Sequence, residues 1–214
     1  LLVVIGILIA LQVNNWNEGR KERIIEKSIL LEFEDNLERN IALIDMAAAE
    51  IIEINKSSET IIDILKEGKS YPDTLVHHFS QLSRSGSYLL QINTNGYESF
   101  KNIGFEILSS KSLKKEILSL FEISYPRYIQ EVEVVNAVWA GKLNFWQDYF
   151  YIRPSQPGWI PLEDSSLSED TKFFTIVIEL WEGRVRVLDQ MMMCKAETQR
   201  VLHLIRNELE RWDS

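Results

Sequence analysis

The residues LERNIALIDMAAAEIIEINKSSETIIDIL, positions 37–65, carry the clearest structural signal in this 214-residue chain. Apolar side chains recur there every three or four positions, which is the heptad pattern of helices that pack at a shallow left-handed crossing angle. No Gly or Pro occurs between Gly19 and Gly68, so we expect one long helix. Its seam would face either the chain's own bundle or a second copy in an oligomer. The seam positions are Leu37, Ile41, Ile44, Ala48, Ile51, Asn55, Ser58, Ile62 and Leu65.

Two polar residues, Asn55 and Ser58, interrupt this apolar seam. An inward Asn lowers stability, but it fixes the register of packed helices when it pairs with a partner. Alternatively, both side chains face a hydrated gap in the bundle. The sequence favours neither interpretation over the other.

The chain opens with the apolar run LLVVIGILIAL, residues 1–11. Eleven helical residues cover roughly 16 Å, about half of the hydrocarbon core of a bilayer. Because the sequence begins with Leu rather than Met, we expect the run to continue upstream. No small-residue cleavage site follows it, and Trp16 beside polar amides is typical of a membrane–water interface. These features favour an uncleaved membrane anchor over a core helix of a soluble protein. The anchor positions are Leu1, Val4, Ile7, Ile9, Leu11 and Trp16.

The segment LVVIGILIALQVNNWNEGRKER, residues 2–23, resembles the N-terminal signature of an uncharacterised family of single-pass membrane proteins common in Bacteroidota. Val13 stands where that family usually has Ile. A looser match is GYESFKNIG, residues 96–104, followed by apolar residues at 113, 117, 120 and 121. The resemblance implies a location, a single-pass protein of the bacterial inner membrane with most of the chain in the periplasm. It implies no activity and no catalytic residue.

The charges after the apolar run bear on this orientation. Arg20, Lys21 and Arg23 argue mildly against a periplasmic location, because positive charge favours the cytoplasmic side of a membrane. Glu18, Glu22 and Glu26 are interleaved with these bases, and we expect them to offset the positive charge locally.

Two further stretches, residues 110–150 and 168–212, keep the three/four rhythm of apolar side chains. Pro126 removes an amide donor and clashes one turn back, so we expect a kink or break near Tyr125. Asp170 lies in an acidic segment that is typical of a helix cap. The expected inward positions of the last helix are Phe174, Val177, Trp181, Val185, Leu188, Met191, Leu202, Ile205, Leu209 and Trp212.

Two connections complete the predicted architecture. In residues 69–109 we expect a compact insert with short helices at 73–82 and 96–102 and a short strand at 87–92. The proline-rich segment 152–167 predicts an ordered loop that packs on the end of the bundle, although its Trp159 is alternatively a contact for a partner protein.

The predicted fold class is therefore all-α, with a transmembrane helix that continues into a coiled-coil-like bundle of three to four long helices. Its parts are the anchor at 1–18, the long heptad helix at 19–68, the small, mostly helical insert at 69–109 and the remaining bundle helices at 110–214. One continuous helix over the first two parts would be roughly 100 Å long.

Composition limits the classes of partner and chemistry. The chain has 23 Lys and Arg against 32 Asp and Glu, and this negative balance disfavours nucleic acid because phosphate binding needs a positive field. A single cysteine, Cys194, excludes an intramolecular disulfide and a multi-cysteine zinc site. The sequence contains no glycine-rich phosphate loop, and none of its three histidines follows a Glu by three positions. We therefore expect no enzyme activity, no cofactor, no metal and no small-molecule substrate.

Long amphipathic helices without a catalytic constellation favour a membrane-tethered bundle that acts through protein–protein contacts. A scaffold, an assembly factor or an accessory subunit of a membrane complex fits this description. The expected partners are the lipid bilayer and a second copy of the chain or another membrane protein. The alternative is a periplasmic ligand-sensing bundle, because bundles bind small molecules between their helices.

Overall fold

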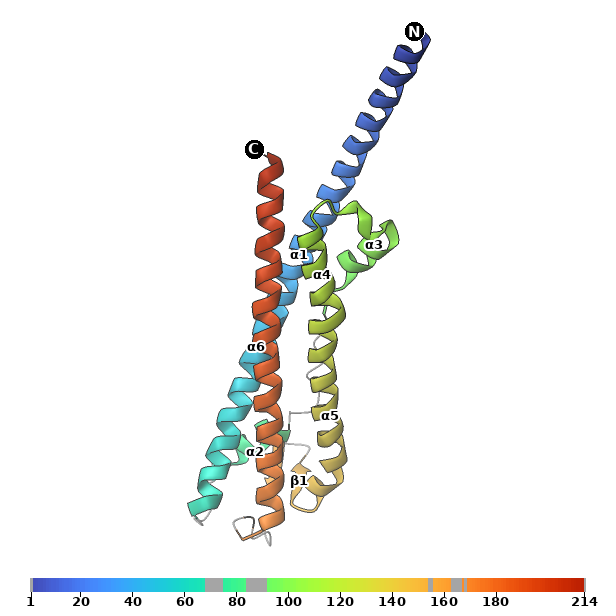
Figure 1. The fold of residues 1–214 in the computed structure, drawn as a ribbon. Helices are drawn as coiled ribbons and strands as arrows, with labels where there is room; N and C mark the ends of the chain where they lie inside the picture. The colour runs from blue at the N-terminus through green and yellow to red at the C-terminus, as the bar shows by residue number, and fades with distance from the viewer. Residues whose placement is uncertain are drawn as a thin grey trace. The chain divides into compact units, whose positions relative to one another are not determined.

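The computed structural model describes residues 2–67, 75–83, 92–153, 156–162, 167 and 169–213. Helices dominate it (Figure 1), which confirms the expected all-α class. The helices are α1 (Leu2–Glu67), α2 (Leu75–Ser83), α3 (Asn95–Ile103), α4 (Lys111–Ser119), α5 (Tyr125–Gln147) and α6 (Thr171–Asp213). Two short turns, the 3₁₀ turn η1 (Phe105–Ile107) and the π-helical turn η2 (Leu120–Ser124), flank α4. The strands β1 (Phe150–Arg153) and β2 (Gln156–Pro161) pair as an antiparallel hairpin.

The first helix, α1, is continuous over 66 residues and contains both the apolar run and the heptad seam. The expected long helix is therefore confirmed, and the expected short helix at 96–102 is present as α3. The anchor residue Leu1, the first two residues of the short helix expected at 73–82 and nearly all of the predicted strand at 87–92 lie outside the described residues.

The chain folds as two compact units, and α1 and α6 contribute to both of them. The first unit contains residues 1–41, 92–124 and 196–214, which include α3, η1, α4 and η2. The second unit contains residues 42–91 and 125–195, which include α2, α5 and the hairpin.

Aromatic side chains form the centre of the first unit. Phe33 of α1 contacts Phe100 of α3 edge-on and Phe121 of η2, with ring centroids 5.7 Å apart in both pairs. Tyr97 of α3 stacks on Phe121 at 4.6 Å. Gly96 lies so close to α1 that a Cβ there would approach Nδ2 of the buried Asn36 to 2.7 Å, so a larger residue at this position would force the Asn36 amide to shift.

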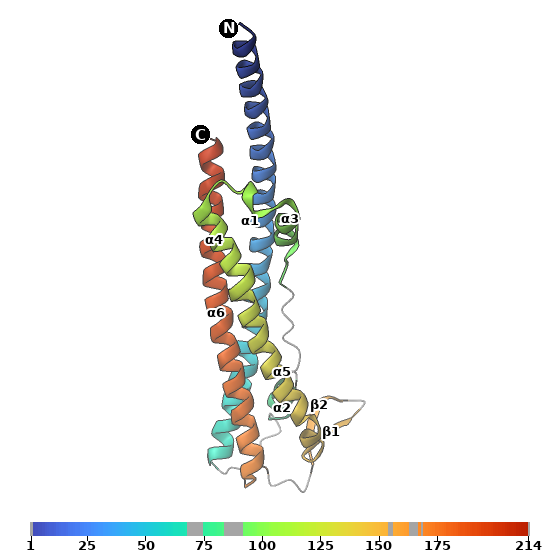
Figure 2. The ribbon, with the colours of Figure 1, turned by 45° about the vertical axis from the view of Figure 1, so that its right-hand side comes forward.

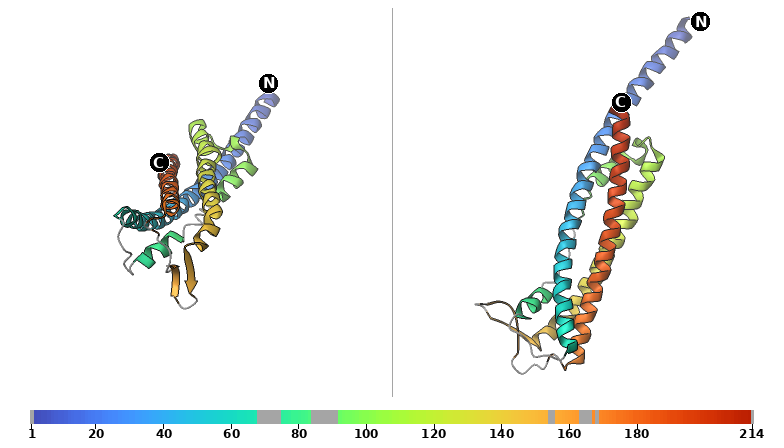
Figure 3. Two further views of the ribbon diagram at one scale, coloured as in Figure 1. Left: turned by 90° about the horizontal axis from the view of Figure 1, so that it is seen from below. Right: turned by 90° about the vertical axis from the view of Figure 1, so that its left-hand side faces the viewer.

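The core of the second unit lies where α2 and the hairpin meet the long helices. Phe79 of α2 contacts Phe150 of β1 at 4.9 Å, and Phe150 contacts Phe173 of α6 at 5.8 Å. Trp146 of α5 meets the same Phe173 at 6.0 Å in a T-shaped arrangement. Figure 3 shows α2 next to the hairpin, and α2 contacts β2.

The hairpin corrects the expectation of a loop at 152–167, because residues 152–153 and 156–161 of that segment are strand. Residues 154–155 lie outside the described residues. Figure 2 shows the hairpin at the end of α5. Phe150 lies opposite Pro161, and Ile152 lies opposite Trp159. Proline is tolerated in a strand at the edge of a sheet, where no partner strand needs its missing N–H group. The prolines of this segment therefore do not prevent pairing in a two-stranded sheet.

The helix interruption expected near Tyr125 is present, but it is a π-helical turn rather than a kink or break. The turn η2 ends at Ser124, directly before α5 begins with Tyr125 and Pro126. In a regular α-helix the ring of Pro126 would clash with the carbonyl one turn back. A wider π turn moves that carbonyl away, so the helical path continues through the proline.

Candidate functional site

The N-terminal part of α1 is the most unusual surface of the first unit. Its large apolar side chains are mostly exposed, between 45% and 74% of their surface, although they lie in regular helix. They are Val3, Val4, Ile5, Ile7, Leu8, Ile9, Leu11 and Val13. Trp16 follows them and is 68% exposed. Gly6 has no atom within 4 Å of the position that a Cβ would take, which agrees with a helix segment that contacts nothing else.

Apolar side chains cover every face of residues 3–13, in which Gln12 is the one polar residue. From here on, the name apolar run refers to these residues, which extend the run at 1–11 to Val13. Consecutive helical residues are rotated by about 100°, so the eight large side chains are distributed around the whole circumference. A helix that is apolar on all sides is characteristic of a protein core or of a membrane environment. An exposed surface of this kind marks a site of contact with lipid or with another protein.

The charged residues after the apolar run separate onto two faces of α1. Glu18, Glu22 and Glu26 follow one another at intervals of four and therefore share one face. Arg20, Arg23 and Lys27 share another face, rotated from the first by more than about 100°. Glu18 and Glu22 therefore point away from Arg20 and Lys27, whereas Lys21 lies on the side of the glutamates.

Glu26 is the one acid of this group that is buried, with 3% of its surface exposed. Its Oε1 accepts hydrogen bonds from the backbone N–H and the hydroxyl of Ser109, at 2.7 and 2.8 Å. Asn14 donates to Glu18 at 3.2 Å on the same face of α1. The acidic face is therefore partly occupied by contacts within the first unit.

Among the helices that the structure describes, none contains an apolar stretch of the length that a membrane crossing requires. Within the same residues, His, Cys, Asp and Glu side chains do not gather in groups of three or more that would hold a metal ion.

The heptad seam lies inside the folded chain. Its apolar members are buried to 7% exposure or less, except Ile41, which is half-buried. The buried members are Leu37, Ile44, Ala48, Ile51, Ile62 and Leu65. Of the two roles that the sequence allowed, the structure shows the seam as part of the chain's own bundle.

The two polar seam residues differ in their contacts. Ser58 is fully buried; its hydroxyl donates to the Ile54 carbonyl at 2.9 Å and accepts from Nη1 of Arg184 at 2.8 Å. Nη2 of Arg184 donates to the Leu82 carbonyl at 3.4 Å. Asn55 is 7% exposed, and its Oδ1 has no hydrogen-bond partner among the described residues. Ser58 therefore faces a buried guanidinium rather than a hydrated gap.

Arg184 points inward and is 1% exposed. A signal for this direction is present in the sequence. Arg184 lies seven residues after Val177 and seven before Met191, and both of these are fully buried. A residue in phase with a buried heptad is expected to point inward whatever its charge.

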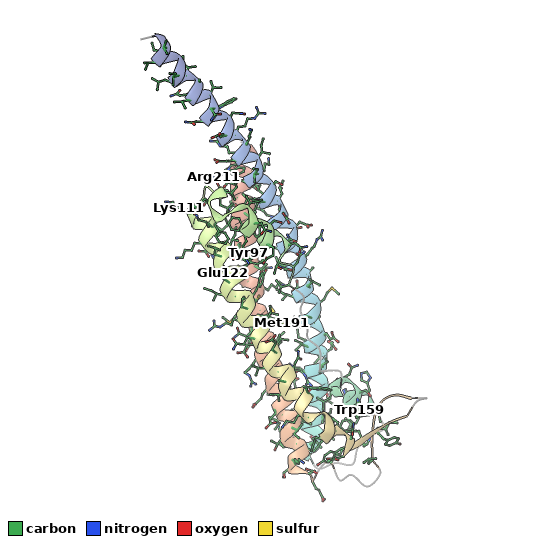
Figure 4. All side chains as sticks on the ribbon, turned by 90° about the vertical axis from the view of Figure 1, so that its right-hand side faces the viewer. Tyr97, Lys111, Glu122, Trp159, Met191 and Arg211 are labelled. Carbon is green, nitrogen blue, oxygen red and sulfur yellow. The ribbon has the colours of Figure 1, made fainter. Side chains whose placement is uncertain are left out.

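Trp159, the predicted alternative partner contact, packs within the second unit. It is half-buried, and its ring lies 6.5 Å from Trp146 and 6.4 Å from Phe150 between centroids (Figure 4). Its backbone N–H donates to Oγ of Ser80 in α2 at 3.2 Å. These contacts match the interpretation of an ordered segment that packs on the bundle end.

Comparison with known proteins gives one match. Residues 1–151 fit the model of a protein family described as "Family of unknown function (DUF6090)". The matched range contains the apolar run, the whole of α1 and the helices up to the start of β1. Comparisons with curated proteins and with solved structures find no match.

Proposed function

The chain belongs to the DUF6090 family of unknown function, and we propose that it is a membrane-tethered helical-bundle protein that acts through contacts with other proteins. The observation that carries this function is the exposure of the apolar run, whose side chains are 45–74% exposed on all faces of α1. A scaffold, an assembly factor or an accessory subunit of a membrane complex is the role that fits.

The apolar run suits lipid better than water. Burial of a large aliphatic side chain contributes about 1.5–3 kcal/mol, and eight such side chains are exposed here. An amphipathic helix that lies on a membrane would have a polar face, and the apolar run has none. Trp16 follows the run directly, at the position where an amphipathic ring favours the membrane–water interface.

The contacts with other proteins would come from the second unit. Exposed large apolar residues remain on its helices, although the seam itself is buried. Among them are Ile129, Val134 and Val138 on α5 and Met192 and Met193 on α6. These residues support association with a second copy of the chain or with another membrane protein. The location included in this function is the bacterial inner membrane, with most of the chain in the periplasm.

Flotation with phospholipid vesicles tests the membrane tether. The unmodified chain is expected to float with vesicles and to stay bound after a carbonate wash. The double substitution Ile7→Asp and Ile9→Asp should release it, because each Asp in the centre of an apolar segment opposes insertion by about 3 kcal/mol. Met46→Asp with Ile52→Asp is the matched control, since both residues are exposed on the same helix outside the apolar run. If both double variants remain bound, the apolar run is not the tether.

Light scattering coupled to size-exclusion chromatography, on the chain in detergent, tests the protein contacts. We expect a particle larger than one chain, and substitution of Val134 and Val138 by Asp should reduce its mass. A strictly monomeric particle that co-purifies with no other protein would contradict action through protein contacts.

A further inference from the structure

A basic basin lies in the first unit directly after the apolar run. Its cationic residues are Arg20, Arg23 and Lys27 of α1 and Arg211 of α6; Ile24, Glu26, Ser109 and Trp212 complete its wall. Its volume is about 570 Å³. Arg211 lies near the C-terminal end of α6 (Figure 4) and is one of the residues that line the basin.

The basin carries a positive charge excess. Four cationic side chains line it against one carboxylate, that of Glu26. This carboxylate is buried and already accepts two hydrogen bonds from Ser109. Nη1 of Arg211 lies 3.1 Å from Glu208, but the Arg211 side chain is still 76% exposed. Glu18 and Glu22 lie on the other face of α1, so they do not neutralise the basin.

A second hollow lies on α1 between the apolar run and the basic basin. It is lined by Asn15, Trp16, Gly19, Arg20 and Arg23. Two of these residues, Arg20 and Arg23, are shared with the basic basin. Along one side of α1, in chain order, lie apolar residues of the run, then Trp16, then Arg20 and Arg23.

Helix geometry places the backbone of Arg20 and Arg23 a few ångströms outside the headgroup layer of a membrane that would hold the apolar run. Arg20 and Arg23 lie roughly 10 and 15 Å along the axis from Val13, the last residue of the apolar run, at about 1.5 Å per residue. The headgroup layer on each side of the hydrocarbon core is about 5–8 Å thick. Long arginine side chains reach back toward this layer, so their guanidinium groups come within reach of lipid phosphates.

We propose that the basic basin binds the phosphate group of an anionic phospholipid headgroup. Planar guanidinium groups bind phosphate oxygens in pairs of parallel hydrogen bonds, which an ammonium group cannot do. Exposed Ile24 and half-buried Trp212 add apolar contact for the glycerol part of the lipid. This assignment rests on the proposed membrane tether, and it adds a preference for anionic lipid to it.

The test compares vesicles of phosphatidylcholine alone with vesicles that also contain phosphatidylglycerol. We expect the full chain to bind the mixed vesicles more tightly. The variant Arg20→Gln, Arg23→Gln, Arg211→Gln should lose this preference, with a decrease of about tenfold to a hundredfold on the mixed vesicles, since each base near an anionic surface contributes about fivefold. Its binding to phosphatidylcholine alone should not change.

The matched control is Lys56→Gln, Lys66→Gln, Arg127→Gln, which removes the same charge from exposed positions outside the basin. It should keep the preference for mixed vesicles. A basin variant that also keeps the preference overturns the headgroup site but leaves the tether intact. Failure of the unmodified chain to bind either vesicle contradicts the tether itself.

A final arm separates a lipid headgroup from a free anion. Inorganic phosphate, added at the ionic strength of a chloride reference, should release the chain from the mixed vesicles no more than chloride does. A stronger release by phosphate, lost in the basin variant, would show that the basin takes a free anion and would overturn its assignment to lipid.

Discussion

Asp170 caps the first turn of α6. Its Oδ1 accepts from the backbone N–H groups of Lys172 and Phe173 at 2.8 and 3.0 Å, and its Oδ2 accepts from the Tyr149 hydroxyl. We expect Asp170→Ala to lower the free energy of unfolding by about 1–2 kcal/mol, because both the cap and a side-chain hydrogen bond are lost. Denaturant unfolding followed by circular dichroism measures the change. Glu169→Ala, an exposed neighbour, is the control and should leave stability unchanged.

The same cap predicts a pH dependence. The hydrogen bond from Tyr149 and the amide of Phe173 lower the pKa of the Asp170 carboxyl from its ordinary value of 3.8, and burial together with this bond raises the pKa of Tyr149 to about 12. A lowered carboxyl pKa gives stability that is present above 3.8 and is lost as the pH falls through the folded value. Asp170→Asn should therefore reduce the loss of stability on acidification. An unchanged acid profile would contradict the role of this carboxylate.

Ser58 contributes through the buried guanidinium of Arg184. We expect Ser58→Ala to lower the free energy of unfolding by about 2 kcal/mol, because it removes a buried hydrogen bond to a charged group. Thr60→Ala is the matched control, since the Thr60 hydroxyl donates to the carbonyl of Lys56 in its own helix, at 3.0 Å, and no bond to another helix is found for it among the described residues. Equal effects of the two substitutions in a thermal unfolding experiment would contradict the importance of the Ser58–Arg184 contact.

The heptad phase predicted that Ser58 faces inward but not what it contacts. The partner, Arg184, is 126 positions away in the chain, and no local pattern connects two residues so far apart. The same holds for Asn40, which is buried and exchanges two hydrogen bonds with the backbone of Asn93, at 2.7 and 3.1 Å. The local periodicity of a sequence indicates which face of a helix is buried. Which residues of other segments that face contacts depends on the whole fold.

Gly183 lies in the middle of α6, where glycine weakens a helix. A Cβ at this position would lie 3.5 Å from both Cγ atoms of Val135 in α5, which is ordinary van der Waals contact. We therefore expect Gly183→Ala to raise the free energy of unfolding by about 0.5–1 kcal/mol, as measured by denaturant unfolding.

The comparison variant for Gly183→Ala is Gly96→Ala in α3. There the Cβ would come within 2.7 Å of Asn36 Nδ2, so this substitution should lower stability. If Gly183→Ala raises the free energy of unfolding and Gly96→Ala lowers it, the gain at Gly183 comes from helix propensity and not from the added methyl group alone. A destabilising Gly183→Ala would mean that α5 and α6 approach more closely than the structure shows.

The presence of the long helices could be predicted from sequence more reliably than which of their side chains face the core. In the N-terminal half of α6 the expected inward residues Phe174 and Trp181 are only half-buried, whereas Phe173 and Leu180 are buried to 2% exposure or less. The residues Phe173 and Phe174 are adjacent and equally apolar, so the sequence pattern fits a helix with either one of them facing the core. The hairpin was missed for a related reason, because its proline content is typical of loops and its burial comes from aromatic contacts with α2 and α6.

The apolar run could be predicted as a surface for lipid, because eleven successive residues without a polar side chain have no face suited to water. The basic basin could not be predicted from the sequence. Its cations come from α1 and from the end of α6, and the interleaved glutamates conceal the charge excess in the sequence. The separation of the charges becomes visible only when the helix assigns each side chain to a face.

Deletion of residues 1–13 should separate membrane binding from folding. Residues 3–13 are exposed throughout, so their removal takes no side chain from either core. We expect the melting temperature to change by less than about 2 °C, which corresponds to about half a kcal/mol for a chain of this size, while vesicle flotation is abolished. Thermal unfolding in mild detergent and flotation of the same preparation measure both quantities. If the deletion lowers the melting temperature strongly, the apolar run packs against the protein rather than lipid; if flotation persists, another surface holds the chain at the membrane.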